Sequence, residues 1–508
     1  MISNSFCGSP RLPLWVALSL LVSTAGVPAA TVTRGPYLQN GSHTNLTVRW
    51  GTDVATDSVV RYGTNLVNLD LVTSDTSDIT EHEIKLTALL PDTTYYYSVG
   101  SSVATLAGSN ANHFFVTAPM PGTPKPTRIW VLGDSGTGTL SARRVRDAYE
   151  TNSARHTDLW LMLGDNAYPE GTDAEYQATL FNMYPNMLRK SVLWPTLGNH
   201  DTASSSAFVD TYPYFDIFTL PKSGEAGGIA SGTEHYYSFD YGNIHFICLD
   251  SMTASRATNG AMFTWLTCDL ANVTADWTIA FWHHPPYSRG SHNSDFETQL
   301  VEMRQVFLPV LEQAGVDLVL AGHSHSYERS FLLDQHYGFA RAFNATNKLD
   351  AGSGREGETG AYQKPQSGPI PHQGTVYVVA GSSGETANGQ FNHPAMYIKG
   401  LRKLGSLVLD IAGDRLDAIF LREDGTTNDF FTIVKSNQPP VLEPVADQVV
   451  DANQPLVLTN IARDFVLPGE ELEFSLLSAP AGARIRNLSS TNAVFSWVPA
   501  CAQGGTTN

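Results

Sequence analysis

Five short motifs between residues 133 and 325 contain side chains of the types that bind metal ions. Aspartate and histidine are the commonest oxygen and nitrogen ligands of transition metals. In four of the motifs a glycine stands just before the ligand, where it lets the chain turn sharply. One such motif is usually an ordinary turn, but five in order indicate a shared site. They are Gly133-Asp134-Ser135-Gly136, Gly164-Asp165-Asn166-Ala167-Tyr168, Gly198-Asn199-His200-Asp201, Ala280-Phe281-Trp282-His283 and Gly322-His323-Ser324-His325.

The residue types in these motifs suit two ions rather than one. A carboxylate has two oxygens and can bridge a pair of ions, and a His-x-His sequence can offer one imidazole to each. Two ions about 3.5–4 Å apart can hold the attacking and the leaving oxygen of a phosphoryl group. The motifs therefore favour a two-metal hydrolase of phosphate esters.

Each motif lies near the end of a predicted strand. Short apolar runs alternate with longer amphipathic stretches, which predicts an α/β domain with a buried sheet. Ligands of such sheets collect beyond the carboxyl ends of the strands. The predicted strands are 129–132, 159–163, 192–197, 244–249, 278–282, 316–321, 375–380, 405–411 and 415–422, and the predicted helices are 140–151, 173–188, 261–271 and 296–314.

A small β domain is expected on either side. Residues 31–120 contain strand candidates at 46–50, 58–62 and 95–99, which predicts a β-sandwich. A proline-rich segment follows, so we expect a linker at 121–127 and the catalytic domain at 128–435. After Asn437-Gln438-Pro439-Pro440, strands are predicted at 472–476 and 493–497. Residues 438–508 resemble an Ig-like repeat, which we expect to be incomplete.

The composition is that of a globular protein of several domains. The 508 residues carry a formal net charge of -18, with no basic run, which argues against nucleic-acid binding. Residues 1–30 are typical of a signal peptide: Arg11 precedes an apolar stretch at 12–22, and small residues follow. That stretch is too short to span a bilayer comfortably. A protein without a membrane span is expected, secreted or periplasmic.

The four cysteines leave two alternatives open. Cys7 lies in the predicted signal peptide, and Cys501 lies near the end of the chain. Cys248 and Cys268 form a disulfide in one interpretation, which suits an oxidising compartment. In the other they are two small buried thiols.

The ordered motifs resemble those of the purple acid phosphatases within the metallophosphoesterase superfamily. The family pattern is G-D-x-G, G-D-x-x-Y, G-N-H-E, V-x-x-H and G-H-x-H, and its tyrosine separates the family from many relatives. The sequence RGPYLQ at residues 34–39 and the later Trp50 resemble the opening of the fibronectin type III-like domain that precedes the catalytic part. The resemblance covers residues 31–435. Asp201 and Ala280 depart from the pattern, but neither side chain is expected to bind metal.

The resemblance implies a dinuclear centre of Fe(III) and a divalent ion (Zn, Mn or Fe). Hard phenolate and carboxylate ligands suit the ferric ion, and imidazole and amide oxygen suit the divalent ion. Asp165 would bridge the two. The implied ferric ligands are Asp134, Tyr168 and His325, and the implied divalent-ion ligands are Asn199, His283 and His323.

Two further histidines are implied catalytic residues. His200 would bind the substrate phosphate, and His292 would lie near the leaving group, where it could bind phosphate or protonate the leaving oxygen. Plant relatives often have a second histidine where Asn293 follows here. The nucleophile would be a metal-bound hydroxide. His284 is expected to be structural rather than a ligand.

The expected function is that of an exported acid phosphatase acting on small-molecule phosphate monoesters. Two alternatives stay open at this point: a phosphodiesterase that uses the same site, and an inactive surface-binding or adhesion protein. The intact set of ligands opposes the inactive protein, whereas the flanking β domains support it.

Overall fold

The computed structural model describes residues 30–204, 211–365, 368–435, 441–463, 473–489 and 491–503, together with Met1 and Gly8. The predicted signal peptide therefore lies almost entirely outside the described residues. None of the helices in the described ranges is long and apolar enough to cross a lipid bilayer.

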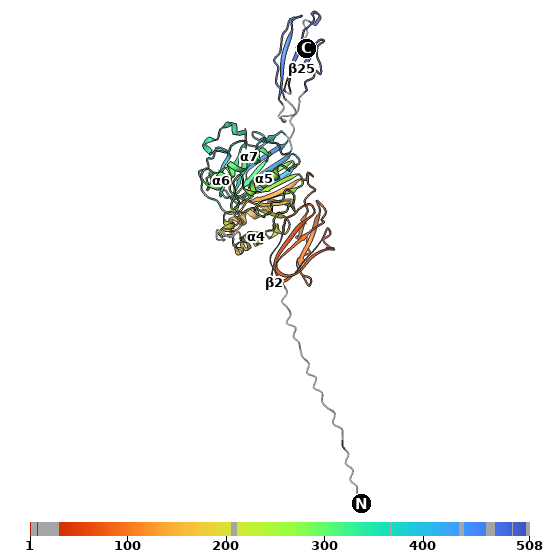
Figure 1. The fold of residues 1–508 in the computed structure, drawn as a ribbon, viewed down its shortest axis with the longest axis vertical. Coiled ribbons are helices and arrows are strands. Elements are labelled where there is room, and N and C mark those ends of the chain that lie inside the picture. The colour runs from red at the N-terminus through yellow and green to blue at the C-terminus, as the bar shows by residue number, and fades with distance from the viewer. Residues whose placement is uncertain are drawn as a thin grey trace.

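The N-terminal part is an antiparallel β domain, drawn in red and orange in Figure 1. Its strand β2 pairs with β1, β3 and β4, and β4 pairs with β5 and β6. The predicted strands 46–50 and 58–62 belong to the one long strand β2, whose pairing with β3 is irregular between them. The strands are β1 (Val32–Gln39), β2 (Leu46–Gly63), β3 (Leu71–Leu86), β4 (Thr94–Gly100), β5 (Thr105–Gly108) and β6 (Phe114–Val116).

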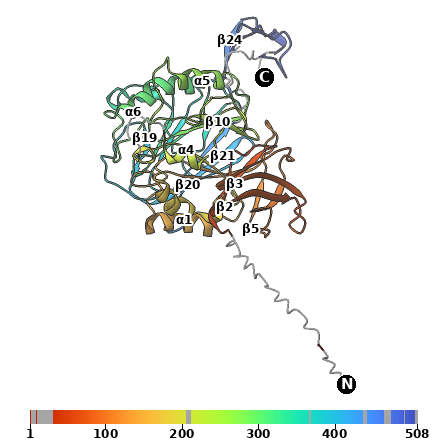
Figure 2. The ribbon, with the colours of Figure 1, turned by 60° about the horizontal axis from the view of Figure 1, so that its bottom comes forward.

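Residues of the RGPYLQ segment form hydrogen bonds between this β domain and the α/β domain. Arg34 donates to both carboxylate oxygens of Asp173 at 2.7 and 2.8 Å, and the Tyr37 hydroxyl donates to the backbone oxygen of Ile217 at 2.8 Å. Arg49 Nη1 donates to the same oxygen at 2.7 Å. One continuous apolar cluster includes Tyr37 and Trp130, so the two domains share a core. Figure 2 shows the β domain beside the α/β domain.

The α/β domain contains two seven-stranded sheets. One has the order β17-β22-β21-β20-β7-β8-β9, and the other β10-β11-β12-β13-β18-β14-β19. Strands β7 to β9 are parallel, as are β11, β12, β13 and β18. Their short apolar runs are buried on both faces, as expected of parallel strands covered on both sides.

The strands of these sheets are β7 (Thr127–Leu132), β8 (Leu159–Met162), β9 (Val192–Pro195), β10 (Tyr237–Tyr241), β11 (Ile244–Cys248), β12 (Trp277–Trp282), β13 (Leu318–Ala321), β14 (Tyr327–Ser330), β17 (Tyr362–Lys364), β18 (Val376–Ala380), β19 (Met396–Leu401), β20 (Gly405–Ala412), β21 (Arg415–Arg422) and β22 (Thr427–Lys435). A two-stranded sheet of β15 (Leu332–Leu333) and β16 (Lys348–Asp350) accompanies them.

Two predicted helices are interrupted. The stretches 173–188 and 296–314 each contain a π-helical turn between shorter helices. Prolines contribute to the breaks, because Pro185 begins α3 and Pro309 lies in the first turn of α7, where it has no N–H to donate. The helical elements are α1 (Leu140–Asn152), α2 (Asp173–Tyr176), η1 (Gln177–Phe181), α3 (Pro185–Leu188), η2 (His200–Thr202), α4 (Pro213–Ile217), α5 (Ala261–Leu270), α6 (Thr298–Glu302), η3 (Met303–Phe307), α7 (Leu308–Gln313), η4 (Ala340–Ala342), η5 (Ala345–Asn347) and η6 (Cys501–Gln503).

The disulfide alternative is wrong for this fold, because Cys248 and Cys268 are both free. Cys248 is buried at the end of β11, and its Sγ lies 3.8 Å from the backbone oxygen of Pro195. Cys268 is exposed on α5, so only Cys248 is the buried thiol of the other interpretation.

A four-stranded antiparallel sheet follows residue 440 and lies apart from the α/β domain (Figure 1). The predicted strand at 493–497 is present in β26, but residues 473–476 form no strand and Leu472 lies outside the described residues. The strands are β23 (Val441–Leu442), β24 (Leu456–Arg463), β25 (Arg484–Asn487) and β26 (Asn492–Trp497).

Candidate metal centre

The five motifs meet where the carboxyl ends of strands from both large sheets come together. Asp134, Asp165 and Asn199 follow β7, β8 and β9 of one sheet, and His283 and His323 follow β12 and β13 of the other. The His323 N–H donates to Asp134 Oδ2 at 2.8 Å, which joins the loops of the two sheets directly.

Close backbone approach explains two of the glycines. A Cβ at Gly198 would lie 2.2 Å from Asp165 Oδ1, and a Cβ at Gly322 would lie 2.5 Å from Asp134 Oδ2. Any larger residue would push a carboxylate out of place. The glycines therefore leave room for the side chains of neighbouring motifs.

One group of side chains gathers around the phenol of Tyr168. Tyr168 Oη donates to Asp165 Oδ2 at 2.9 Å and lies 3.4 Å from both Asp134 Oδ1 and His325 Nε2. His325 Nε2 in turn lies 3.5 Å from Asp134 Oδ1. We call Asp134, Tyr168 and His325 the tyrosine subsite.

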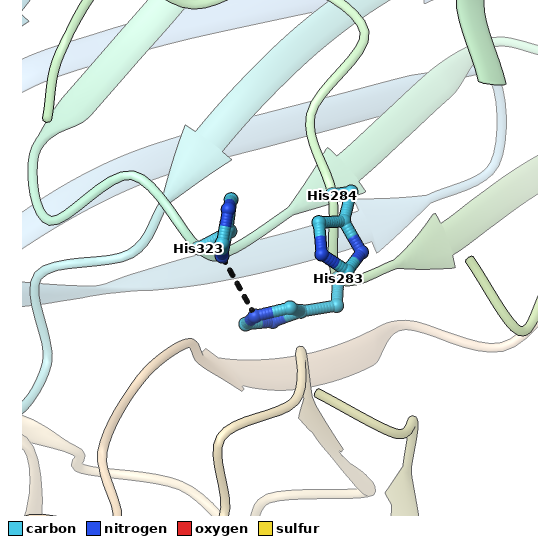
Figure 3. Close-up of side chains that lie close together, drawn as sticks. All are labelled: His283, His284 and His323. Carbon is cyan, nitrogen blue, oxygen red and sulfur yellow. Dashed lines mark hydrogen bonds between the residues drawn. The ribbon is translucent and has the colours of Figure 1, made fainter. Parts of the chain in front are cut away.

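A second group gathers around His283 Nε2. This nitrogen lies 3.1 Å from Asn199 Oδ1. It lies 3.2 Å from His323 Nδ1, the contact that the dashed line in Figure 3 marks. His283 Nδ1 lies 2.8 Å from the carbonyl oxygen of Leu163, which can only accept, so Nδ1 carries a proton. In its neutral form the ring therefore presents a lone pair at Nε2. We call Asn199, His283 and His323 the histidine subsite.

Asp165 lies between the two subsites and presents one oxygen to each. Its Oδ2 accepts from Tyr168, and its Oδ1 lies 3.5 Å from His283 Nε2. Asp165 Oδ1 also accepts the backbone N–H of His200 at 2.9 Å. The carboxylate is thus oriented as a bridging ligand must be.

The donor set fits metal ions. In the histidine subsite the acceptor Asn199 Oδ1 faces the lone pair of His283 Nε2 at 3.1 Å, an arrangement that a cation satisfies. Burial raises the pKa of Tyr168, and the charges of Asp134 and Asp165 raise it further, so the phenol cannot ionise there without a cation. Within the described ranges, the contacts of these three side chains include no lysine or arginine.

The charge of the centre also acts on its histidines. Burial alone would lower the pKa of His283, but Asp165 and Asp134 hold it above the ordinary value. Burial likewise opposes protonation of His325, yet its contact with Asp134 raises the pKa to about 9. Metal ions would therefore displace protons from this site.

His284 adjoins the histidine subsite, and its ring also contacts Ser251. Its ligand atom lies within 4.8 Å of those of His283 and His323 (Figure 3). Its Nδ1 is 2.9 Å from Ser251 Oγ, and burial holds its pKa well below the ordinary value. This placement agrees with a structural role.

His200 and His292 lie at the rim of the centre. The His200 ring packs on Tyr168 with centroids 4.3 Å apart, and its Nδ1 lies 2.7 Å from the carbonyl oxygen of Pro169. The His292 ring packs on His323 with centroids 3.6 Å apart, and its Nδ1 lies 2.9 Å from Glu297 Oε2. In the part of the chain that the structure describes, neither Nε2 atom has a hydrogen-bond partner.

Asp201 has a role that sequence reasoning missed. Its buried carboxylate accepts from the backbone N–H groups of Asn166 and Gly198 at 3.0 and 2.8 Å and from Tyr176 Oη at 2.6 Å. It therefore ties the loop after β8 to the loop after β9. Burial, followed by the charge of Asp165, raises the pKa of Asp201 to about 7. Its place in the third motif was the only sequence signal.

Comparison with known proteins gives the same architecture. A model of the calcineurin-like phosphoesterase family matches residues 127–327, and a model of the purple acid phosphatase N-terminal domain matches residues 34–117. Purple acid phosphatase 23 of Arabidopsis thaliana is 30% identical over 278 residues, covering 49% of this chain and 57% of that protein. Purple acid phosphatase 1 of Ipomoea batatas is 30% identical over 260 residues, covering 49% and 51%. The chain thus spans about half the length of the curated relatives it matches.

Solved structures show the fold at lower identity. Purple acid phosphatase PPD1 from yellow lupin (Lupinus luteus) superposes with a TM-score of 0.62 at 17% identity, covering 79% of this chain and 75% of that one. The structure of PhoD gives a TM-score of 0.56 at 13% identity, covering 81% and 92%. Fold and site together define a metallophosphoesterase domain behind an N-terminal β domain. Within that class, the chain is similar to the purple acid phosphatases in both its N-terminal β domain and its α/β domain.

Proposed function

We propose that this protein is an exported acid phosphatase that hydrolyses phosphate monoesters at a dinuclear metal centre. The observation that carries the proposal is the convergence of seven donor side chains from five loops of two sheets, with Asp165 between the other six. The carboxylates of Asp134 and Asp165 are buried without a lysine or arginine among their described contacts, which favours cations between them and the nitrogen ligands. Two cations suit phosphoryl transfer.

The two subsites differ in the ion they favour. The phenol and carboxylate of the tyrosine subsite suit Fe(III), and the imidazoles and amide oxygen of the histidine subsite suit Zn, Mn or Fe as a divalent ion. Asp165 serves both. When bound, the ions supply Lewis-acid polarisation of the phosphoryl oxygens and lower the pKa of coordinated water.

The rim histidines act on the substrate. With Nδ1–H donated to the Pro169 carbonyl, a protonated His200 has Nε2–H free to donate to a phosphoryl oxygen. His292 has Nδ1 on Glu297, so its Nε2 is free to give a proton to the leaving oxygen. Their placement on opposite subsites suits binding at one end of the ester and proton transfer at the other.

Export rests on the leader-like residues 1–30. Expression of the full chain in a secretion-competent host, followed by N-terminal sequencing of the mature protein, tests it. A start near Thr31 is expected, and retention of Met1 inside the cell contradicts export.

The reaction is tested by metal content and by paired substrates. Purified protein is expected to hold about two ions and to lose activity with a chelator. Asp165→Ala is expected to lose both ions. A nitrophenyl monoester should be hydrolysed faster than the corresponding diester. A strong diester preference would instead indicate a phosphodiesterase, and a protein without metal or metal-restored activity would indicate a binding protein.

A further inference from the structure

Each histidine of the His323-Ser324-His325 sequence turns one ring nitrogen to the centre and the other to a glutamate. His323 Nδ1 is 3.2 Å from His283 Nε2, and its Nε2 is 3.2 Å from Glu297 Oε2. His325 has the opposite orientation, with Nε2 3.5 Å from Asp134 Oδ1 and Nδ1 3.3 Å from Glu385 Oε1. Neither glutamate belongs to the five motifs.

Glu297 is held at the start of α6 between two histidines. Its Oε2 contacts both His323 Nε2 and His292 Nδ1, and its Oε1 accepts the backbone N–H of Asn293 at 3.0 Å. Its side chain is 36% exposed. One carboxylate therefore positions a residue of the histidine subsite and the proposed proton donor together.

Glu385 lies on a different segment, after β18. Its neighbour Ala387 donates its N–H to the backbone oxygen of His325 at 2.9 Å. Its neighbour Gly384 packs against the loop after β7. A Cβ added at Gly384 would lie 2.4 Å from the backbone oxygen of Asp134. The segment is thus tied to two members of the tyrosine subsite.

We propose that Glu297 and Glu385 are positioning residues, one for each metal subsite, and that they set opposite tautomers of His323 and His325. The proposal rests on the proposed function. A carboxylate on the outer nitrogen keeps the proton there, aims the inner lone pair at the ion and makes the ligand more basic. His323 then binds through Nδ1 with its proton on Nε2, and His325 binds through Nε2 with its proton on Nδ1.

The two glutamates have separable effects because they support different subsites. Loss of Glu297 should weaken the ion of the histidine subsite and also release His292. Loss of Glu385 should weaken the ion beside Tyr168 and leave His292 in place. A general structural defect would affect both ions alike.

The test uses the full-length protein with Glu297→Gln, Glu385→Gln and the control Glu170→Gln. Glu170 is exposed two residues after Tyr168, so its substitution removes the same charge without a histidine contact. Metal-free samples are titrated with Zn²⁺ and with iron in competition with a chromophoric chelator, and the visible band reports the tyrosine subsite. Thermal melts of the metal-free proteins check the fold.

Glu297→Gln is expected to weaken Zn²⁺ binding about 10- to 100-fold with the visible band unchanged. Glu385→Gln is expected to shift or weaken that band and leave Zn²⁺ binding unchanged, and Glu170→Gln to change neither. In kinetics, Glu297→Gln should lower kcat more for an alkyl phosphate than for a nitrophenyl phosphate at similar KM. Glu385→Gln should affect both substrates equally.

Two results overturn the proposal: both glutamine variants binding both ions as tightly as the wild type, or each variant weakening both subsites equally. A wild-type protein that binds no ions would contradict the proposed function instead. If a glutamine variant does not fold, Glu297→Asp and Glu385→Asp are measured, and each is expected to weaken the same subsite by a smaller factor.

Discussion

Three of the proposed ligand residues have a backbone conformation that side chains usually avoid. Asp134, Asp165 and His323 have φ values of 57°, 51° and 65°. Such conformations of residues other than glycine cost on the order of 1 kcal/mol or more each and gather at functional sites. The surrounding hydrogen bonds, such as that from the His323 N–H to Asp134, hold them in place.

Tyr168 gives the clearest prediction at this scale. Tyr168→Phe is expected to abolish visible colour while the fold stays intact, because in the proposed centre the Tyr168 phenolate would be the ligand whose charge transfer to Fe(III) absorbs visible light. Visible absorption and circular dichroism measure the two effects. Tyr96→Phe is the control and should keep the colour. An unchanged spectrum in Tyr168→Phe would mean that Tyr168 is not a ferric ligand.

Asp201 links two site-bearing loops, so its effect extends beyond one residue. Asp201→Ala leaves the Asn166 and Gly198 N–H groups without their carboxylate, at a cost of about 1–3 kcal/mol for each buried donor. Denaturant unfolding of the metal-free protein measures this loss. Asp201→Asn keeps one acceptor oxygen and should lose less. Equal stability of wild type and Asp201→Ala would contradict the linking role.

At the scale of elements, His245 connects β10, β11 and α5. Its Nδ1 lies 2.7 Å from Asp240 Oδ1, and its Nε2 lies 2.9 Å from Asp269 Oδ2. Burial alone would lower the pKa of His245, but the two carboxylates raise it to about 9. The charged imidazole thus joins a strand hairpin to the helix that covers it.

This pKa predicts how stability depends on pH. Because the folded pKa exceeds the unfolded value near 6.5, the stabilisation is complete below about pH 6.5 and is lost as pH rises through about 9. We expect a loss of about 3 kcal/mol for a shift of this size. The measurement compares free energies of unfolding of wild type and His245→Gln from pH 6 to 10. Parallel curves for the two proteins would refute the prediction.

The secondary-structure elements also show what the local sequence pattern predicts and what it does not. Apolar runs located β7, β8, β12 and β18 well, because strands buried on both faces are continuous apolar runs. The helix predicted at 296–314 breaks into α6, η3 and α7, and its π turn begins and ends at the buried residues Met303 and Phe307. Amphipathic periodicity alone does not report such a turn.

At the scale of the whole molecule, the N-terminal β domain and the α/β domain act as one body. Tyr37 is fully buried between them, packs on Phe181 with ring centroids 4.9 Å apart and donates to the Ile217 oxygen. The RGPYLQ segment is therefore an interface.

Tyr37→Ala is expected to lower the free energy of unfolding by about 3–5 kcal/mol, because it removes a buried aromatic ring. Residues 31–435 should still unfold in one transition, since the core is continuous. Tryptophan fluorescence and circular dichroism should then report coincident unfolding curves. Tyr37→Phe removes only the hydroxyl and should lose about 1 kcal/mol. Two separate transitions in the wild type would contradict a shared core.

The sequence by itself determined the residue types of the centre and their order, because each of the five motifs follows its own strand and that signal is local. It also indicated the family and the β domain before the catalytic part. The tertiary structure decided the rest: which nitrogen of His323 and His325 faces inward, the contacts of Glu297, Glu385 and Asp201, and the free state of Cys248. These depend on packing between segments far apart in the chain. Asp134 and His323, hydrogen-bonded across the two sheets, are 189 residues apart.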